Sequence, residues 1–146
     1  MTTRNFVLTI GILYLLVGAL GFFPGLVSAP HAGAPSVTVD TGYGYLLGLF
    51  PVNVLYNLFH LAIGVMALAA YRSLSRSIAF SRGLAILFGV LTVMGLIPML
   101  STTFGLIPLF GHNVWLHAVT AVIAAYFGYA RTAEAVPVEW EARRAS

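Results

Sequence analysis

The chain has no cysteine, no lysine and little charge of either sign. Its seven basic residues are all Arg, and none of its four acidic residues lies within a long apolar run. The missing cysteine excludes disulfides, thiolate catalysis and Cys-ligated metals. Because the apolar runs contain no Asp or Glu, they cannot hold a carboxylate pair for acid–base catalysis. Because the arginines do not cluster with aromatic residues, we expect no nucleic-acid partner.

Apolar residues dominate what is present. The chain is 60% hydrophobic and 8% charged, with a mean hydropathy of +0.95, whereas soluble domains are roughly 25% charged. Such a chain has too few polar residues to cover its surface in water. The composition therefore predicts a membrane protein that crosses the lipid bilayer several times.

Four apolar runs approach the length of about 20 residues that crosses a bilayer. We predict transmembrane spans over residues 5–23, 52–71, 78–97 and 109–130. They form one domain, residues 1–131, followed by a charged cytoplasmic tail, residues 132–146. The first run exceeds the roughly 7–15 apolar residues of a signal peptide, so we predict that it is a span and is not cleaved.

Proline and asparagine mark the starts of the second and fourth spans. Pro51 is predicted at the first helical position, where its missing N–H is harmless. The fourth span has two predicted starts, Pro108 or Asn113, the latter being a good N-cap. The segment between the first two spans, residues 24–50, contains several Pro and Gly and is predicted to be a loop.

All seven arginines fall on one side of the predicted spans. With four spans, the N-terminus, the middle loop and the C-terminus share a side, and the other two loops contain no Arg. Because basic segments stay in the cytoplasm, we predict that both termini are cytoplasmic.

The pattern Gly-apolar-apolar-Pro occurs at the outer end of each predicted span. The four copies are Gly21–Pro24, Gly48–Pro51, Gly95–Pro98 and Gly105–Pro108. Aligning Gly48–Tyr71 with Gly105–Gly128 matches Pro51 to Pro108 and His60 to His117. We therefore predict two helical hairpins in the same orientation, related by a pseudo-two-fold axis along the membrane normal.

The second and fourth spans each carry polar residues on one helical face. Their spacings of three and four residues are the period of such a face. We call them the polar stripe: Asn53, Asn57 and His60, with Asn113, His117 and Thr120. The other two spans have comparable stripes, Gly11–Tyr14–Gly18–Gly21 and Ala85–Gly89–Thr92. Small and polar residues let membrane helices pack closely, so we predict a four-helix bundle with all four stripes inward.

His60 and His117 are the candidate functional residues, and three interpretations remain open. The favoured one is that both are neutral and link helices by hydrogen bonds. The second is bis-histidine binding of haem b or a chlorophyll-like pigment, because helical bundles hold such cofactors between facing helices. The third is a proton or small-solute path, because ionisable groups inside membranes are functional candidates.

Two further histidines lie in or near the outer loops. With Asp40, His31 and His112 have the residue types of a surface metal site. Loop histidines are usually solvated, so we predict no metal there.

Three motifs resemble a known family. They are the Gly18–Gly25 segment, the Leu47–Gly64 segment with Asn57 and His60, and Trp115-Leu116-His117. They resemble the bacterial four-helix membrane proteins grouped as domain-of-unknown-function family 4383. The resemblance implies membrane localisation, supports the importance of Asn57, His60 and His117, and implies no enzyme activity. The family often has a further His where this chain has Tyr56, which weakens any mechanism that needs a histidine there.

These observations predict an all-α protein of the bacterial inner membrane, built from two parallel hairpin repeats. Its predicted function is that of a non-enzymatic structural or interaction component. We expect its partners to be lipids and other membrane subunits or further copies of itself. A haem- or pigment-binding electron-transfer subunit is the alternative, and a small-solute or proton transport component is the second alternative.

Overall fold

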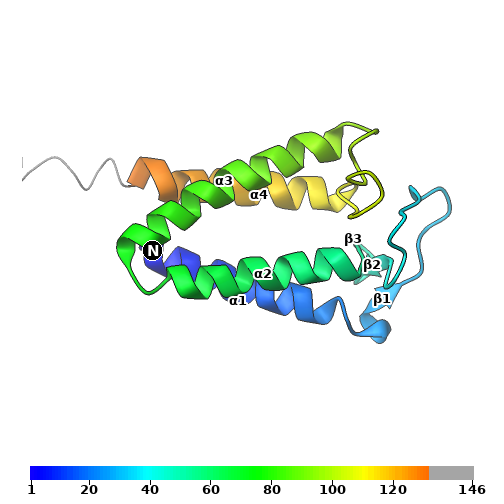
Figure 1. Ribbon diagram of the computed structural model, residues 1–146, viewed down its shortest axis with the longest axis horizontal. Coiled ribbons are helices and arrows are strands. Elements are labelled where there is room, and N and C mark those ends of the chain that lie inside the picture. The colour runs from blue at the N-terminus through cyan, green and yellow to red at the C-terminus, as the bar shows by residue number, and fades with distance from the viewer. Residues whose placement is uncertain (132–146) are drawn as a thin grey trace, which may run out of the picture.

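The computed structural model describes residues 1–131, and the fold is mostly helical (Figure 1). Its helices are α1 (Thr3–Leu20), α2 (Val54–Ala70), α3 (Leu74–Leu96) and α4 (His112–Ala125), the last continued by a π-helical turn, η2 (Tyr126–Ala130). All four run along the long dimension of the molecule, with α1 packed against α2 and α3 against α4. The predicted charged tail, residues 132–146, lies outside the described residues.

Side-chain caps determine where three helices begin. The side-chain oxygens of Thr2, Asn53 and Ser73 each accept a hydrogen bond from the backbone N–H three residues later. Each bond satisfies one of the unpaired donors of a first turn. Asn53 therefore starts α2 at Val54, and the prediction that Pro51 holds the first helical position is wrong. Ser73 likewise starts α3 earlier than the predicted residue 78.

The start of α4 also differs from both predictions. The helix begins at His112, after Gly111 with a φ of 65°, a left-handed conformation that glycine adopts without steric cost. Asn113 does not cap the helix because its side-chain amide donates to the carbonyls of Pro51 and Pro108. The Asn113 side chain, which the sequence predicted as an N-cap, therefore makes tertiary hydrogen bonds instead.

A small antiparallel sheet closes one end of the molecule. Its strands are β1 (Val27–Ser28), β2 (Gly44–Leu46) and β3 (Phe50–Val52), in the order β1-β2-β3 and preceded by a 3₁₀ turn, η1 (Pro24–Leu26). Tyr45 pairs with Pro51. The sequence predicted a loop here, since strands of two or three residues are too short to show an alternating pattern.

Glycines allow α1 and α2 to approach closely. A Cβ added at Gly18 would lie 2.8 Å from the backbone oxygen of Asn57, and one added at Gly64 would lie 2.6 Å from Cγ of Leu15. Neither position has room for a methyl group. Gly11, Tyr14, Gly18 and Gly21 of the first predicted stripe are all buried.

The stripe predicted for α3 does not face the interior. Ala85, Gly89 and Thr92 are only half-buried, and a Cβ added at Gly89 would meet nothing within 4 Å. The buried face of α3 is instead Ser77, Ser81, Leu84, Phe88 and Leu91. Large apolar side chains of α3 fill the interior. The prediction that its small residues face inward is therefore wrong.

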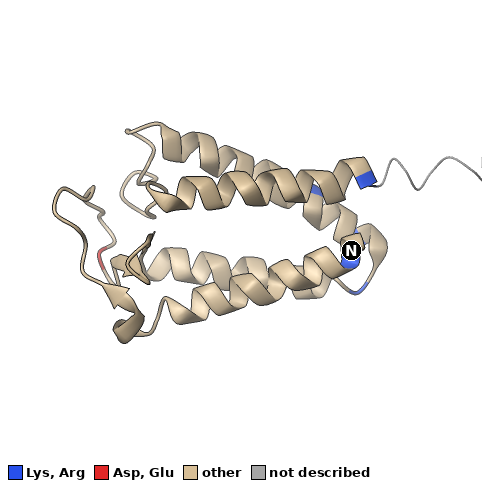
Figure 2. Cartoon of the chain, turned by 180° about the vertical axis from the view of Figure 1, so that it is seen from behind, with Lys and Arg blue, Asp and Glu red and all other residues tan. Residues whose placement is uncertain are grey.

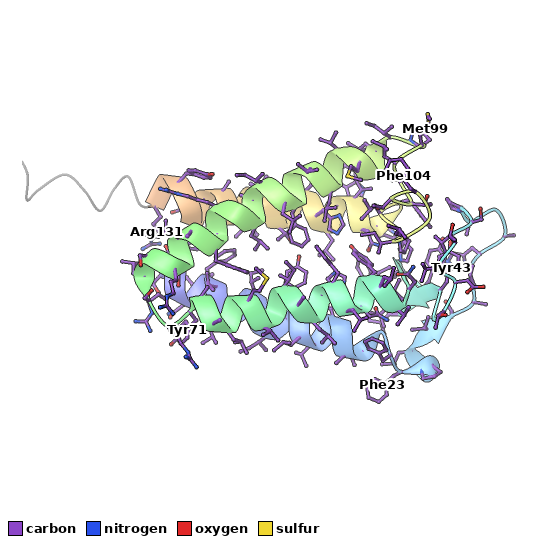
Figure 3. All side chains as sticks on the ribbon, viewed as in Figure 1. Phe23, Tyr43, Tyr71, Met99, Phe104 and Arg131 are labelled. Carbon is purple, nitrogen blue, oxygen red and sulfur yellow. The ribbon has the colours of Figure 1, made fainter. Side chains whose placement is uncertain are left out.

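Two of the helices are long and apolar enough to cross a membrane. They are α1 and α3, while α2 is apolar but shorter. Figure 3 shows side chains along the outer faces of the helices as well as between the helix pairs.

Charge is divided between the two ends of the molecule (Figure 2). The arginines of the described residues gather at the end that holds the N-terminus and the α2–α3 turn, whereas Asp40 lies in the loops at the sheet end. Arg143 and Arg144 belong to the part of the chain that is not described.

Candidate functional site

Two asparagines join the helix pairs at the sheet end. Asn53 Nδ2 donates to the carbonyls of Val39 (2.9 Å) and Leu106 (2.7 Å). Asn113 Nδ2 donates to the carbonyls of Pro51 (2.7 Å) and Pro108 (2.9 Å). Each asparagine thus binds the Gly-apolar-apolar-Pro segment that precedes the other one's helix. Both side chains are buried, so these bonds replace those that water would make.

The third asparagine of the stripe, Asn57, connects α2 to the end of α1. Its Nδ2 donates to the carbonyl of Gly21 at 2.8 Å, while its Oδ1 has no hydrogen-bond partner among the described residues. A Cβ at Gly21 would collide with this amide. Glycine at the end of α1 is therefore what allows the Asn57 side chain to lie there.

About one turn after Asn53 on α2 and Asn113 on α4, a hydroxyl–imidazole pair crosses between the helix pairs. The Tyr56 hydroxyl on α2 is hydrogen-bonded to Nε2 of His117 on α4. Beside it, the hydroxyls of Tyr14 on α1 and Thr120 on α4 lie 3.2 Å apart and share a hydrogen bond. Tyr56 and His117 are both fully buried. Polar contacts of this kind hold membrane helices together.

His60 lies against this pair without bonding to it. Its ring centroid is 4.2 Å from that of Tyr56 and 5.3 Å from that of Tyr14. The side chain is 2% exposed, and neither ring nitrogen has a hydrogen-bond partner among the described residues. A neutral imidazole has one donor and one acceptor. His60 is therefore the polar side chain of the stripe with the most unused hydrogen-bonding capacity.

The residues around the two histidines do not fit a group ligated by both. Nε2 of His117 is occupied by Tyr56, and the Tyr56 ring lies beside His60. The ring of Phe88 packs 5.0 Å from that of His117. A planar tetrapyrrole between the imidazoles would have to displace these aromatic side chains. The geometry thus gives the haem or pigment hypothesis no support.

All six residues of the predicted polar stripe are buried, and five of them contribute hydrogen bonds that connect separate segments. Sequence reasoning placed Tyr14 on the inward stripe of the first span but did not include Tyr56 and Phe88. Tyr56 follows Asn53 by three residues and precedes His60 by four, so helical periodicity alone would have placed it on the same face. Phe88 carries no such signal.

The loop histidines each lie against an aromatic ring of the small sheet. His31 packs on Tyr45, with ring centroids 4.1 Å apart, and His112 lies 6.2 Å from the ring of Phe50. Within residues 1–131, no group of three or more His, Cys, Asp or Glu side chains comes together.

One comparison with known proteins found a match. A family model described as a domain of unknown function (DUF4383) matches residues 4–130. Comparisons with curated proteins and with solved structures gave no significant match.

Proposed function

We propose that this chain, which belongs to the DUF4383 family, is a multi-pass protein of the bacterial inner membrane that acts as a non-enzymatic interaction component. The observation that carries the proposal is the distribution of polarity. The polar stripe is buried, while large apolar side chains are half or more exposed on every helix, among them Leu16, Val65, Ile86, Val93, Trp115 and Val122. This arrangement suits lipid, where backbone and side-chain polar groups must be satisfied internally.

The placement of charge supports a topology with both termini in the cytoplasm. Arginine gathers at the end that holds the N-terminus and the α2–α3 turn. Cytoplasmic loops of membrane proteins carry such an excess of basic residues. The sheet end, which contains Asp40, would then face outward.

Matched contacts in the two helix pairs support the proposal of parallel hairpin repeats. Arg4 Nε on α1 donates to the carbonyl of Tyr71 at 3.0 Å, and Arg82 Nε on α3 donates to that of Gly128 at 2.8 Å. Tyr71 and Gly128 are aligned in the two repeats. In each pair an arginine of the first helix therefore donates to a carbonyl at the corresponding position of the second, although the two arginines are offset by four residues when Gly21 is aligned with Gly95.

The sheet end offers a second matched pair. Gly21 at the end of α1 lies against Asn57, and a Cβ at Gly95 near the end of α3 would lie 2.9 Å from Val114. Asn57 and Val114 are aligned in the two repeats, and both glycines begin a Gly-apolar-apolar-Pro segment.

The buried cluster supports the non-enzymatic part of the proposal. Tyr56, His117, Tyr14 and Thr120 use their polar groups on one another, in bonds that cross between helices. In the proposed role these bonds fix the helix arrangement, and the protein acts through lipids and through other membrane subunits or further copies of itself.

His60 supports a second candidate function, transfer of protons or a small solute. Its unused ring nitrogens lie in the interior, next to two tyrosines. Intramembrane ionisable groups commonly mark such paths. Proton flux into vesicles loaded with a pH-sensitive dye would decide between the candidates. Flux that stops with His60→Ala would replace the proposal, whereas equal flux with and without the protein supports it.

Two experiments test the main proposal. Reporter fusions after Gly33 and after Ser75 should report opposite sides of the membrane, with Ser75 cytoplasmic, and same-side signals would refute the topology. The absorption spectrum of gently purified protein should show no haem or pigment band. A band that disappears in His60→Ala and His117→Ala variants would overturn the non-enzymatic assignment in favour of electron transfer.

A further inference from the structure

An open groove of about 370 Å³ lies where the end of α2 meets the start of α3. It belongs to the end of the molecule where the arginines gather, opposite the small sheet (Figure 2). Its volume is within the range of ligand sites in proteins. We call it the α2–α3 groove, and its lining residues are Met66, Ala69, Ala70, Arg76, Ala79 and Phe80.

A buried serine joins the two helices that form this groove. Ser77 Oγ on α3 donates to the carbonyl of Ala70 on α2 at 3.1 Å, and Ser81 Oγ donates to the carbonyl of Ser77 at 2.8 Å. Both serines are buried. The first bond holds the end of α2 against the start of α3, so the groove is formed before any ligand binds.

The walls of the groove are accessible from outside the molecule. Met66 is 57% exposed, and the side chains of Ala69, Arg76 and Ala79 are also exposed. At about 1.5 Å of rise per residue, Arg76 lies within one turn of the start of α3, while Phe80 lies a turn further along it. The groove therefore has a basic mouth at the helix ends and an apolar wall that continues along the helices.

Arg76 gives the groove its formal charge, and its guanidinium has no hydrogen bond or ion pair within residues 1–131. Arg4 and Arg82 differ, since each donates to a backbone carbonyl and lies over a tyrosine ring. The acidic residue of the described part of the chain, Asp40, lies at the opposite end. A free guanidinium beside an apolar wall complements a molecule with an anionic head and a hydrocarbon chain.

We propose that the α2–α3 groove binds an anionic phospholipid of the inner leaflet. Its phosphate pairs with Arg76, and an acyl chain packs against Met66 and Phe80. Guanidinium groups bind phosphate through charge-assisted hydrogen bonds. A zwitterionic lipid presents the same phosphate, but its own cation offsets the charge, so the anionic headgroup is preferred. The inference rests on the proposed membrane topology, which places the α2–α3 turn in the cytoplasm.

The test is native mass spectrometry of the full chain in detergent micelles, titrated with two lipids. Palmitoyl-oleoyl phosphatidylglycerol and palmitoyl-oleoyl phosphatidylcholine have the same acyl chains and differ in net charge. We expect the first to bind about fivefold more tightly, the effect of one basic residue on an anionic lipid. Equal affinities for the two lipids would overturn the proposal.

Charge variants locate the headgroup. Arg76→Gln should abolish the preference for phosphatidylglycerol. Arg131→Gln is the matched control, because it removes the same charge from the same end of the molecule at an exposed position outside the groove. A preference that survives Arg76→Gln, or that both variants lose equally, would refute the assignment to Arg76.

Alanine variants locate the acyl chain. Ala69→Phe fills part of the groove and should weaken phosphatidylglycerol binding at least fivefold, while Ala62→Phe, at an exposed position of α2 outside the groove, should change it less than twofold. Equal affinities for these two variants would sink the placement. A protein dimer that carries no lipid and dissociates in Ala69→Phe would assign the groove to a second copy of the chain, against the proposal.

The reporter fusions separate this inference from the function on which it rests. If they place Ser75 in the cytoplasm and the lipids bind equally, the groove assignment alone is wrong. If they place Ser75 on the outer side, the topology and the inner-leaflet assignment are wrong, whatever the lipid preference in detergent.

Discussion

The Tyr56 hydroxyl is hydrogen-bonded to Nε2 of His117, and this bond joins α2 of one helix pair to α4 of the other. It lies in the interior, with the Tyr14–Thr120 hydrogen bond as a second link between the pairs. Because the phenol occupies Nε2, Nδ1 is the ring nitrogen of His117 without a partner among the described residues. The structure thus makes Tyr56 the central residue of the buried cluster.

Removing the Tyr56 hydroxyl should destabilise the protein. Tyr56→Phe leaves both ring nitrogens of His117 without partners among the described residues, and we expect a loss of about 1–2 kcal/mol. Thermal unfolding in detergent micelles would measure it. Tyr126→Phe is the matched control, since Tyr126 is exposed on η2 and keeps its ring contact. Equal midpoints for the two variants would contradict the role assigned to the bond.

Asn53→Ala should cost more stability than the loss of a helix cap alone. The variant loses the bond that caps α2 and both bonds from the amide to the carbonyls of Val39 and Leu106. A cap is worth about 1 kcal/mol. The unfolding midpoint should therefore fall by more than the loss of a cap produces.

Ser73 provides the comparison for the cap alone. Ser73→Ala removes the cap of α3, and among residues 1–131 the Ser73 hydroxyl is hydrogen-bonded only within its own segment, to Ser75 and Arg76. We expect Asn53→Ala to cost more than Ser73→Ala. The opposite order would show that the loop carbonyls contribute little.

Two helical glycines should respond differently to the same substitution. Gly18→Ala places a methyl group against the α2 backbone and should force α1 and α2 apart, at a cost of about 1–3 kcal/mol. Gly89→Ala meets nothing within 4 Å and should be neutral or stabilising by up to about 1 kcal/mol. Unfolding midpoints measure both, and equal effects would mean that α1 and α2 are not in close contact.

The guanidinium of Arg82 should contribute to stability, unlike that of Arg76. Arg82 donates to the Gly128 carbonyl and lies over the Tyr129 ring, so Arg82→Gln should cost about 1 kcal/mol. Arg76→Gln removes the same charge from the same helix, where the guanidinium makes no hydrogen bond to the described residues. A shared loss in both variants would point to net charge as the cause.

The burial of the polar stripe followed from sequence alone. Spacings of three and four residues placed Asn53, Asn57 and His60 on one face of α2. With lipid expected outside, that face was predicted to lie in the interior. The Gly-apolar-apolar-Pro segments similarly marked the sheet end of the molecule. These features are local, so a single sequence carries them.

Predictions from the sequence were wrong where contacts with a distant segment decide the position of a side chain. Asn113 suits an N-cap, but the carbonyl of Pro51 took its amide. Small residues on α3 suggested an inward face, but Phe88 fills the interior between the helix pairs. Such outcomes depend on which segments meet, and helical periodicity does not encode that.

By itself the sequence determined an apolar, mostly helical chain of the DUF4383 family, with its arginines at one end and its polar groups on defined helical faces. Only the tertiary structure decided that Tyr56 packs on His60 while bonding to His117. It also decided that the Asn57 amide lies against Gly21 with its oxygen unpaired among the described residues. The physical reason is that periodicity fixes which face of a helix is buried. The rotation and pairing of helices, set by close contacts such as those of Gly18 and Gly64, fix what that face meets.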